Sequence, residues 1–185
     1  MLYLASRSPR RKELLKQLGV EFETLSVNIE EIWDGRESAN QYVSRLALEK
    51  AEAGKVLAEK DLPILASDTE VVLDGKILGK PQNSADAIVM LMSLSGRSHE
   101  VYTAVALLQE TEKIRVSVNQ VSFKELTEEE CRIYSDTGEP EDKAGAYAIQ
   151  GKAAAFVTKL EGSYSGVMGL PLSETAELLN SIRFP

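Results

Sequence analysis

Hydrophobic and polar positions along this chain follow two alternating patterns, one with the period of a helix and one with the period of a strand. Apolar residues recur every three or four positions in five segments, which we expect to be helices. Most of these segments begin with a residue typical of a helix N-terminus, as in the Ser38-x-x-Gln41 and Thr127-x-x-Glu130 capping boxes. The predicted helices are 9–18, 38–60, 84–94, a segment from Thr127 that stops at Gly138, and 173–182.

Short apolar or alternating runs lie between these helices and predict strands. Asp74-Gly75 predicts a hairpin turn within one of them. In 113–123 the apolar residues change faces between Val118 and Val121, which predicts a bulge near Asn119 and Gln120. Helices that alternate with strands, together with hairpins, predict an α/β fold with a mixed sheet and no linker, so that 1–185 is one domain. The predicted strands are 2–5, 20–27, 62–67, 70–78, 99–109, 113–123 and 154–160.

The composition is that of an ordinary globular protein, with 43% hydrophobic and 27% charged residues and a formal net charge of -8. This acidic balance argues against a nucleic-acid or membrane partner, so any anionic ligand must be held by a local cluster of cations. Cys131 is the only cysteine, which excludes an internal disulfide and a multi-cysteine metal site. With no signal-peptide pattern at the start, we expect a cytoplasmic protein.

Arg10 and Arg11 are unusual because they fall in the first turn of a predicted helix, where the helix dipole is already positive. Both lie at the end of the apolar stripe of that helix. They either extend past the stripe into solvent or, with the free N–H groups of the helix, bind a phosphate. Lys50 presents the same choice, because it continues the inward face of the helix predicted at 38–60.

Carboxylates and a further cation complete the candidate chemistry. Asp68 is expected in a loop between two strands, where catalytic groups are often held, and Lys80 follows the next hairpin. Glu31 could share a divalent cation, Mg²⁺ or Mn²⁺, with Asp68, since such ions combine a few carboxylates with substrate phosphates. The alternatives are a turn-forming aspartate and a solvated acidic loop.

Three further polar residues carry weaker signals. Gln150 follows a glycine-rich stretch and has an amide that could recognise the edge of a nucleobase. His99 is the only histidine and has no partner pattern for a catalytic triad, so a structural role is favoured. Cys131 is expected to be a small core residue.

The chain resembles the Maf family of nucleoside triphosphate pyrophosphatases through an ordered set of motifs between Leu4 and Leu172. The resemblance implies a fold like that of the inosine triphosphate pyrophosphatases, with a long curved mixed sheet and a cleft between two lobes. It also implies cleavage of a nucleoside triphosphate to the monophosphate and pyrophosphate with the help of a divalent cation. The matching motifs are LASRSPRRKELL, RLALEKA, SDT, LDGKILGKP, GRSHEVYTAV, GEPEDKAGAYAIQG and GSYSGVMGLPL.

Within that family, Arg10, Thr69 and Gln150 stand where members similar to the dTTP/UTP pyrophosphatases have the same residues. Members that act on 7-methyl-GTP have Trp, Gln and Glu there. The implied activity is therefore hydrolysis of canonical or modified pyrimidine triphosphates, which removes them from the nucleotide pool. The alternatives are 7-methyl-GTP hydrolysis and a non-catalytic, nucleotide-binding regulator of septum formation. Arg7, Glu70 and Gly166 depart from the usual family pattern.

The mechanistic hypothesis combines these residues. Arg10, Arg11, Lys50 and Lys80 would bind the triphosphate, and Glu31 with Asp68 would hold the divalent cation. Asp68 would accept the proton of the water that attacks the α-phosphorus. Arg11 is expected to be the better phosphate ligand, whereas Arg10, Thr69 and Gln150 would select the substrate. The expected partner is a small-molecule nucleoside triphosphate, and the oligomeric state, a homodimer included, stays open.

Overall fold

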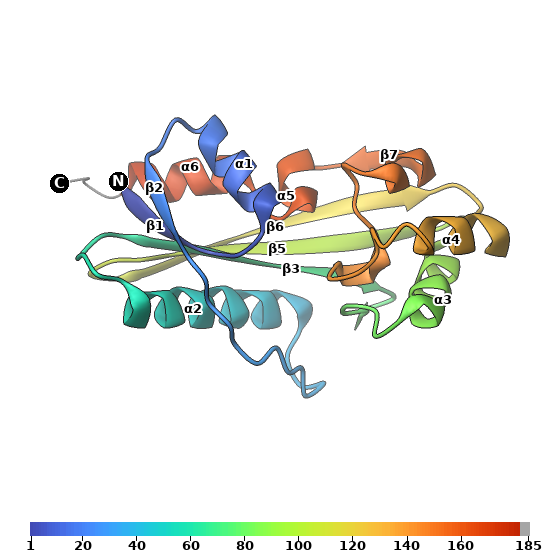
Figure 1. The fold of residues 1–185 in the computed structure, drawn as a ribbon, viewed down its shortest axis with the longest axis horizontal. Coiled ribbons are helices and arrows are strands. Elements are labelled where there is room, and N and C mark those ends of the chain that lie inside the picture. Colours follow the sequence, from blue (N-terminus) through green and yellow to red (C-terminus); the bar gives the residue numbers. More distant parts are fainter. Residues whose placement is uncertain (182–185) are drawn as a thin grey trace.

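The fold is built on a seven-stranded sheet, seen in a computed structural model that describes residues 1–181 (Figure 1). The strand order is β2-β1-β3-β5-β6-β7, with β4 paired to β3. β1 is parallel to β2 and β3, and the other pairs are antiparallel, which confirms the predicted mixed α/β sheet. The strands are β1 Leu2–Ala5, β2 Phe22–Leu25, β3 Ile64–Leu73, β4 Lys76–Ile77, β5 Ser98–Leu108, β6 Glu112–Phe123 and β7 Val157–Glu161.

Six α-helices and two 3₁₀ helices occupy the described part of the chain. The side chains of Ser8, Ser38 and Thr127 cap their helices as predicted, the last two in complete capping boxes. One short helix, α5, was not predicted, and the predicted end of the last helix at Ile182 lies outside the described residues. The helices are α1 Pro9–Gln17, α2 Ala39–Leu57, α3 Ser84–Leu94, α4 Glu128–Ser135, α5 Tyr164–Met168 and α6 Leu172–Asn180, with 3₁₀ helices at Ala144–Ala146 and Lys152–Phe156. None of these helices is long and apolar enough to cross a membrane.

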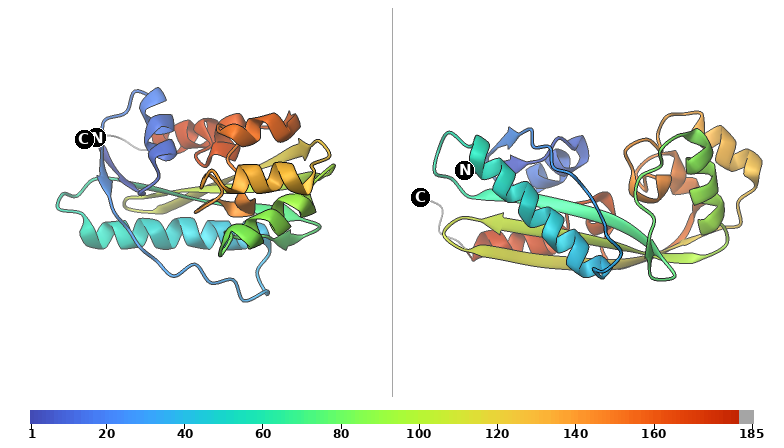
Figure 2. Two further views of the ribbon diagram at one scale, coloured as in Figure 1. Left: turned by 45° about the vertical axis from the view of Figure 1, so that its right-hand side comes forward. Right: turned by 90° about the horizontal axis from the view of Figure 1, so that it is seen from below.

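Helices cover the two ends of the sheet differently, and this produces two lobes joined by β3, β5 and β6 (Figure 2). In the first lobe α2 packs on one face of the sheet through Ala51, against Ile64 and Ala66. On the opposite face, α1 and α6 pack against Leu65. In the second lobe α3, α4 and both 3₁₀ helices form a separate apolar cluster with β7.

Two strand predictions were wrong for one physical reason, the continuous pairing along β5. No break occurs at Asp68, because β3 pairs with β5 without interruption from Ile64 to Val72. No bulge occurs near Asn119, because β5 and β6 stay in register and the irregularity lies between Ser122 and Phe123, opposite β7. The apolar residues of β6 change faces because the buried face contains Asn119, whose amide oxygen accepts a hydrogen bond from the Ser163 N–H at 2.6 Å.

The other edge of β3 is only partly paired. β1 pairs with Ile64 and Leu65, and β4 pairs with Val72 and Leu73. Between these two pairs, residues 66–70 have no neighbouring strand on this edge within the described sheet. Since side chains alternate along a strand, this open edge presents Asp68 and Glu70 on the α2 side and Thr69 on the side of α1.

Candidate functional site

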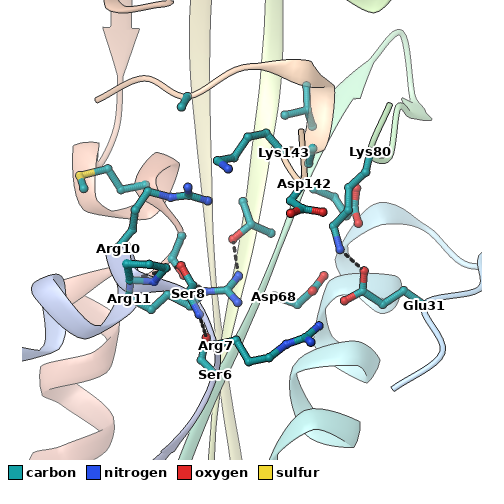
Figure 3. A pocket seen from close by; sticks show the side chains of 18 of the residues that line it. Ser6, Arg7, Ser8, Arg10, Arg11, Glu31, Asp68, Lys80, Asp142 and Lys143 are labelled. Carbon is teal, nitrogen blue, oxygen red and sulfur yellow. Dashed lines mark hydrogen bonds and ion pairs between the residues drawn. The ribbon is translucent and has the colours of Figure 1, made fainter. Parts of the chain in front are cut away.

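A pocket of about 570 Å³ opens along this unpaired edge of β3, between the two lobes (Figure 3). Its charged residues come from several separate segments, and within the described chain six of them are basic and four acidic. The basic residues are Arg7, Arg10, Arg11, Lys50, Lys80 and Lys143, and the acidic residues are Glu31, Asp68, Glu70 and Asp142. A protein with a net charge of -8 therefore gathers an excess of positive charge in one pocket, which suits a polyanionic ligand.

Lys50 is the centre of an ion-pair cluster on the α2 side of β3. Its side chain is 12% exposed, and its Nζ lies 2.5 Å from Asp68 Oδ1 and 2.7 Å from Glu31 Oε1. Lys80 bonds to the other oxygen of Glu31 (Figure 3). Asp68 Oδ2 is buried and has no hydrogen-bond partner among the described residues. One lysine thus holds two carboxylates together and leaves one oxygen of Asp68 free for chemistry.

The carboxyl groups of this cluster have shifted pKa values. Burial alone would raise the pKa of Glu31, but the charges and hydrogen bonds of Lys50 and Lys80 outweigh it and lower that pKa to about 2. Burial raises the pKa of Glu70 to about 8, and the negative charges of Asp68 and Glu31 raise it further. Glu31 is therefore an anion at neutral pH, whereas Glu70 is largely neutral in the absence of a bound cation.

Arg11 lies on the other side of β3 and fixes the position of Thr69. Its Nε donates to the carbonyl oxygen of Gly169 at 2.7 Å, and its Nη2 donates to Thr69 Oγ1 at 3.2 Å (Figure 3). Burial lowers the pKa of the Arg11 guanidinium, and the nearby Asp68 charge opposes that change. Gly169 has a φ of 109°, and its carbonyl also accepts from Ser67 Oγ at 2.8 Å. Arg11 therefore has a structural role beside the phosphate contact expected of it.

The second lobe contributes the far wall of the pocket. The Gly145 N–H donates to the Gly79 carbonyl at 2.8 Å and so joins the segment after β4, which bears Lys80, to the segment that bears Lys143. Gln150 lies exposed at the rim, and Arg10 is half-buried on α1. These residues are held by separate lobes, so a ligand that contacts all of them must bridge the cleft.

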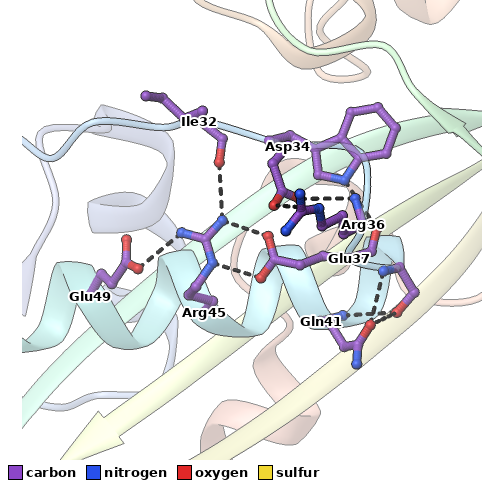
Figure 4. A network of polar contacts seen from close by, with 9 residues as sticks. Ile32, Asp34, Arg36, Glu37, Gln41, Arg45 and Glu49 are labelled. Carbon is purple, nitrogen blue, oxygen red and sulfur yellow. Dashed lines mark hydrogen bonds and ion pairs between the residues drawn. The ribbon is translucent and has the colours of Figure 1, made fainter.

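The loop that carries Glu31, residues 26–38, has no regular secondary structure and is fixed to α2 by Arg45 (Figure 4). The Arg45 guanidinium bonds to both oxygens of Glu37 at 2.7 and 2.6 Å and to the Ile32 carbonyl at 3.1 Å. It also bonds to Glu49 at 2.9 Å. Glu31, next to Ile32 in the chain, is thereby kept within reach of Lys50.

The donor set suits a divalent cation in chemical type. Glu31 and Asp68 offer hard carboxylate oxygens, and the unpartnered Oδ2 of Asp68 is an acceptor without a donor. Within residues 1–181, however, no three His, Cys, Asp or Glu side chains are already gathered as a ready metal site. A cation held here would therefore need ligands from the substrate as well.

The structure brings all eight candidate site residues predicted from the sequence into the lining of one pocket: Arg10, Arg11, Glu31, Lys50, Asp68, Thr69, Lys80 and Gln150. The expectation that Asp68 lies in a loop was wrong, since it stands in the middle of β3. The strand predicted at 20–27 ends at Leu25, so Glu31 lies in a loop. Sequence reasoning missed Arg7 and Asp142 as lining residues, because no helix or strand pattern predicts their orientation. Two other lining residues did have a signal in the sequence. Lys143 lies in a glycine-rich stretch, and Glu70 stands where the family more usually has an apolar residue.

His99 and Cys131 lie outside this pocket. His99 is 2% exposed, its Nε2 is 2.8 Å from the Tyr147 hydroxyl, and its ring packs against Phe123. Cys131 is fully buried in the second lobe. Both expectations of a structural position are confirmed.

Taken together, the two-lobed mixed sheet and the cationic cleft with its central carboxylates define an α/β protein built to bind a polyanion such as a nucleotide. Comparison with known families narrows this class. The sequence model of the Maf-like protein family matches residues 1–182, and the chain belongs to that family.

Several curated relatives are similar to this chain over nearly its whole length. A dTTP/UTP pyrophosphatase from Escherichia coli O157:H7 is 53% identical, with 97% of this chain and 92% of that protein covered. One from Xanthomonas euvesicatoria is 52% identical, with 98% of each chain covered. One from Alkalilimnicola ehrlichii is 51% identical, with 97% of this chain and 91% of that protein covered.

Solved structures give a more distant likeness. The Ham1 protein of Staphylococcus aureus matches with a TM-score of 0.48 and 14% identity, over 66% of this chain and 71% of that one. A dITP/XTP pyrophosphatase from Mycobacterium abscessus matches with a TM-score of 0.45 and 20% identity, over 66% of this chain and 73% of that one.

Proposed function

We propose that this protein is a dTTP/UTP pyrophosphatase that cleaves the nucleotide to its monophosphate and pyrophosphate. The observation that carries the proposal is the pairing of Asp68 and Glu31 through Lys50 inside a pocket otherwise rich in arginine and lysine. Curated relatives with about 50% identity bear that name. Arg10, Thr69 and Gln150 all line the same pocket, as expected of residues that select a pyrimidine nucleotide.

Binding of the triphosphate is assigned to the cations on both sides of the cleft. Arg10 lies half-buried near the N-terminus of α1, where free backbone N–H groups add to its charge. Lys80 lies on the other side of Asp68 from Arg10 (Figure 3), and Lys50 bonds to Asp68 itself. Since Arg11 already donates to Gly169 and Thr69, its remaining N–H groups are the ones available to a phosphate oxygen. Catalysis then rests mainly on orientation and on charge stabilisation.

Asp68 is assigned as the proton acceptor. Its Oδ1 is bonded to Lys50, which fixes the orientation of the carboxylate, while Oδ2 has no partner and is open to a further contact. As the water oxygen attacks the α-phosphorus, the bond to the oxygen between the α- and β-phosphorus atoms breaks and pyrophosphate leaves. The proton of the water passes to the Asp68 carboxylate.

A divalent cation, Mg²⁺ or Mn²⁺, is part of this proposal, with Glu31 and Asp68 as its protein ligands. Once bound, such an ion lowers the pKa of its water and balances the charge of the leaving pyrophosphate. The support for it is the unpartnered Asp68 Oδ2 and the hard-oxygen donor set, and the ion would take the place of part of the Lys50 interaction.

Pyrophosphate release across a panel of nucleotides tests the activity. The panel contains dTTP, UTP, modified pyrimidine triphosphates, the other canonical triphosphates and 7-methyl-GTP, each with and without Mg²⁺ or Mn²⁺. We expect dTTP and UTP to be among the best substrates and pyrophosphate to be the product. A preference for 7-methyl-GTP, or release of orthophosphate, would overturn the proposal. Absence of turnover with every triphosphate would favour a non-catalytic, nucleotide-binding regulator.

Replacement of Asp68 by Asn tests the assigned proton acceptor. The amide keeps the shape of the side chain but does not accept the proton, so we expect kcat with dTTP to fall by about 10²–10⁴-fold. Binding of a non-hydrolysable dTTP analogue should change far less. Glu100→Gln, a half-buried glutamate on the neighbouring strand that does not line the pocket, serves as the matched control. Near-normal turnover of Asp68→Asn would exclude Asp68 from this role.

A further inference from the structure

Glu70 is a buried acid that the mechanism above does not use. It lies two residues after Asp68 on β3, so both side chains point to the α2 side of the strand. Glu70 is 5% exposed and lines the same pocket as Asp68. Glutamate is rarely buried unless it is paired, so its position at this edge needs a partner.

No side chain in the described part of the chain supplies that partner. Glu70 Oε2 is buried without a hydrogen-bond donor, and so is Asp68 Oδ2. The two lysines of the cluster are already engaged, Lys50 with Glu31 and Asp68, and Lys80 with Glu31. A buried acceptor without a donor costs about 1–3 kcal/mol, and more if it is charged. Two such oxygens on one strand face, in one pocket, indicate a shared ligand that accepts lone pairs.

The charges of the cluster point to a cation as that ligand. Lys50 and Lys80 balance the charges of two carboxylates, and Glu70 adds a third acidic group without an ion pair of its own. Without a cation, a proton keeps Glu70 largely neutral; a divalent cation that replaces this proton offsets the charge of the ionised carboxylate and accepts a lone pair from each of the two oxygens. Oxygen donors of this kind select a hard divalent cation.

We propose that Glu70 is a third carboxylate ligand, beside Glu31 and Asp68, of the divalent cation assigned above; this inference rests on the proposed function. The three carboxylates are not gathered at ligating distance in the structure, where lysine ammonium groups bond to two of them. Rotation of the Glu70 side chain about its flexible bonds brings its carboxylate toward Asp68, which lies two residues earlier on the same face of β3.

Direct measurement of Mn²⁺ binding tests this role. Free Mn²⁺ is followed by electron paramagnetic resonance during titration of the protein, with and without the α,β-methylene analogue of dTTP. We expect Glu70→Gln to weaken Mn²⁺ binding by tenfold or more, while its melting temperature shows that it is folded. Glu70→Asp keeps the charge but shortens the side chain, so its Mn²⁺ affinity should fall between those of the unmodified protein and Glu70→Gln.

The matched control is Glu174→Gln. Glu174 also has a buried oxygen without a partner, but it lies in the first turn of α6 and does not line the pocket. Its replacement should leave Mn²⁺ affinity unchanged. If Glu70→Gln does not fold, Glu70→Asp alone carries the test.

Three results would overturn the inference: Glu70→Gln binding within twofold of the unmodified protein, Glu70→Asp binding as tightly as that protein, or no Mn²⁺ binding by that protein at all. The second result would show that Glu70 acts only through its charge. Pyrophosphate release from dTTP by the unmodified protein is measured in parallel. Turnover with normal metal binding in Glu70→Gln would reject this inference alone, whereas absence of turnover with any triphosphate would reject the proposed function.

Discussion

Gly145 shows how a single residue can fix the width of the pocket. Its φ of 66° lies in the left-handed region, and a Cβ placed on it would lie 2.8 Å from a methyl group of Val71. The absence of a side chain lets the second lobe pack directly on β3, beside the open edge, and lets the Gly145 N–H reach Gly79. Both Lys80 and Lys143 depend on this contact for their positions.

Replacement of Gly145 by Ala should therefore destabilise the protein by about 2–4 kcal/mol, from backbone strain plus overpacking. Gly75→Ala is the matched control, because Gly75 has a similar φ of 75° but nothing within 4 Å of its Cβ position. That variant should lose only about 1 kcal/mol, the cost of the backbone conformation. Urea denaturation of both variants measures the difference. Equal losses would mean that the close packing on Val71 contributes nothing.

At the scale of elements, the loop 26–38 is the one that most needs support, because it carries Glu31 without any strand or helix of its own. Arg45 supplies that support through Glu37 and the Ile32 carbonyl. An exposed ion pair is normally worth about 0–1 kcal/mol, but a bidentate pair with an added carbonyl bond orders a whole loop. Arg45 is a positioning residue in this sense, since it does not line the pocket itself.

Arg45→Ala should loosen the loop and lower kcat/KM for dTTP by about tenfold, because Glu31 no longer stays on Lys50. A second readout is independent of activity. Arg36 is exposed in the same loop, so trypsin should cleave after it faster in the variant than in the unmodified protein. Arg132→Ala, which removes an exposed arginine paired with Glu129 on α4, should change neither quantity. Unchanged cleavage after Arg36 in Arg45→Ala would show that the loop is held by other contacts.

Sequence-based prediction was accurate where an element depends on nearby residues and wrong where it depends on pairing with a distant segment. Helix starts were predicted correctly at Ser8, Ser38 and Thr127, because a cap depends on residues three or four positions apart. The position of Asp68 was wrong because it depends on pairing with a strand more than thirty residues away. The same holds for the site: the pattern of α2 predicted that Lys50 faces inward, but its two carboxylate partners come from distant segments. α5 has five residues, too few to show a helical period.

For the molecule as a whole, stability should depend on pH through His99. Burial lowers the pKa of His99 to about 4, against an ordinary value of 6.5. Between pH 6.5 and 4 the unfolded chain therefore binds a proton that the folded protein does not, and the free energy of unfolding falls as pH falls. This contribution amounts to about 3 kcal/mol over that range.

Comparison of the protein with His99→Gln by urea denaturation at pH 7, 5.5 and 4 measures this effect. The variant should lose less stability than the unmodified protein on acidification, whatever its constant offset at pH 7. Glu70, with its raised pKa, acts in the opposite direction in part of this range, but it is present in both proteins and cancels in the difference. Parallel pH curves would contradict the assignment of His99 as a neutral, buried residue.

The open edge of β3 also sets a length. The five residues from 66 to 70, which are unpaired on this edge, span roughly 17 Å, at about 3.3 Å per residue. β1 and β4 pair with the two ends of this gap in fixed register, so the number of β3 residues between them sets the distance between the two lobes. Insertion of one residue before Asp68 would move Asp68 to the face of β3 on which Arg11 lies. Insertion of two residues would keep every side chain on its face and lengthen the open edge by about 7 Å. The length of the cleft along β3 thus depends on the number of unpaired strand residues. It changes in steps of whole residues, so it can be adjusted when nucleotide-sized clefts are designed.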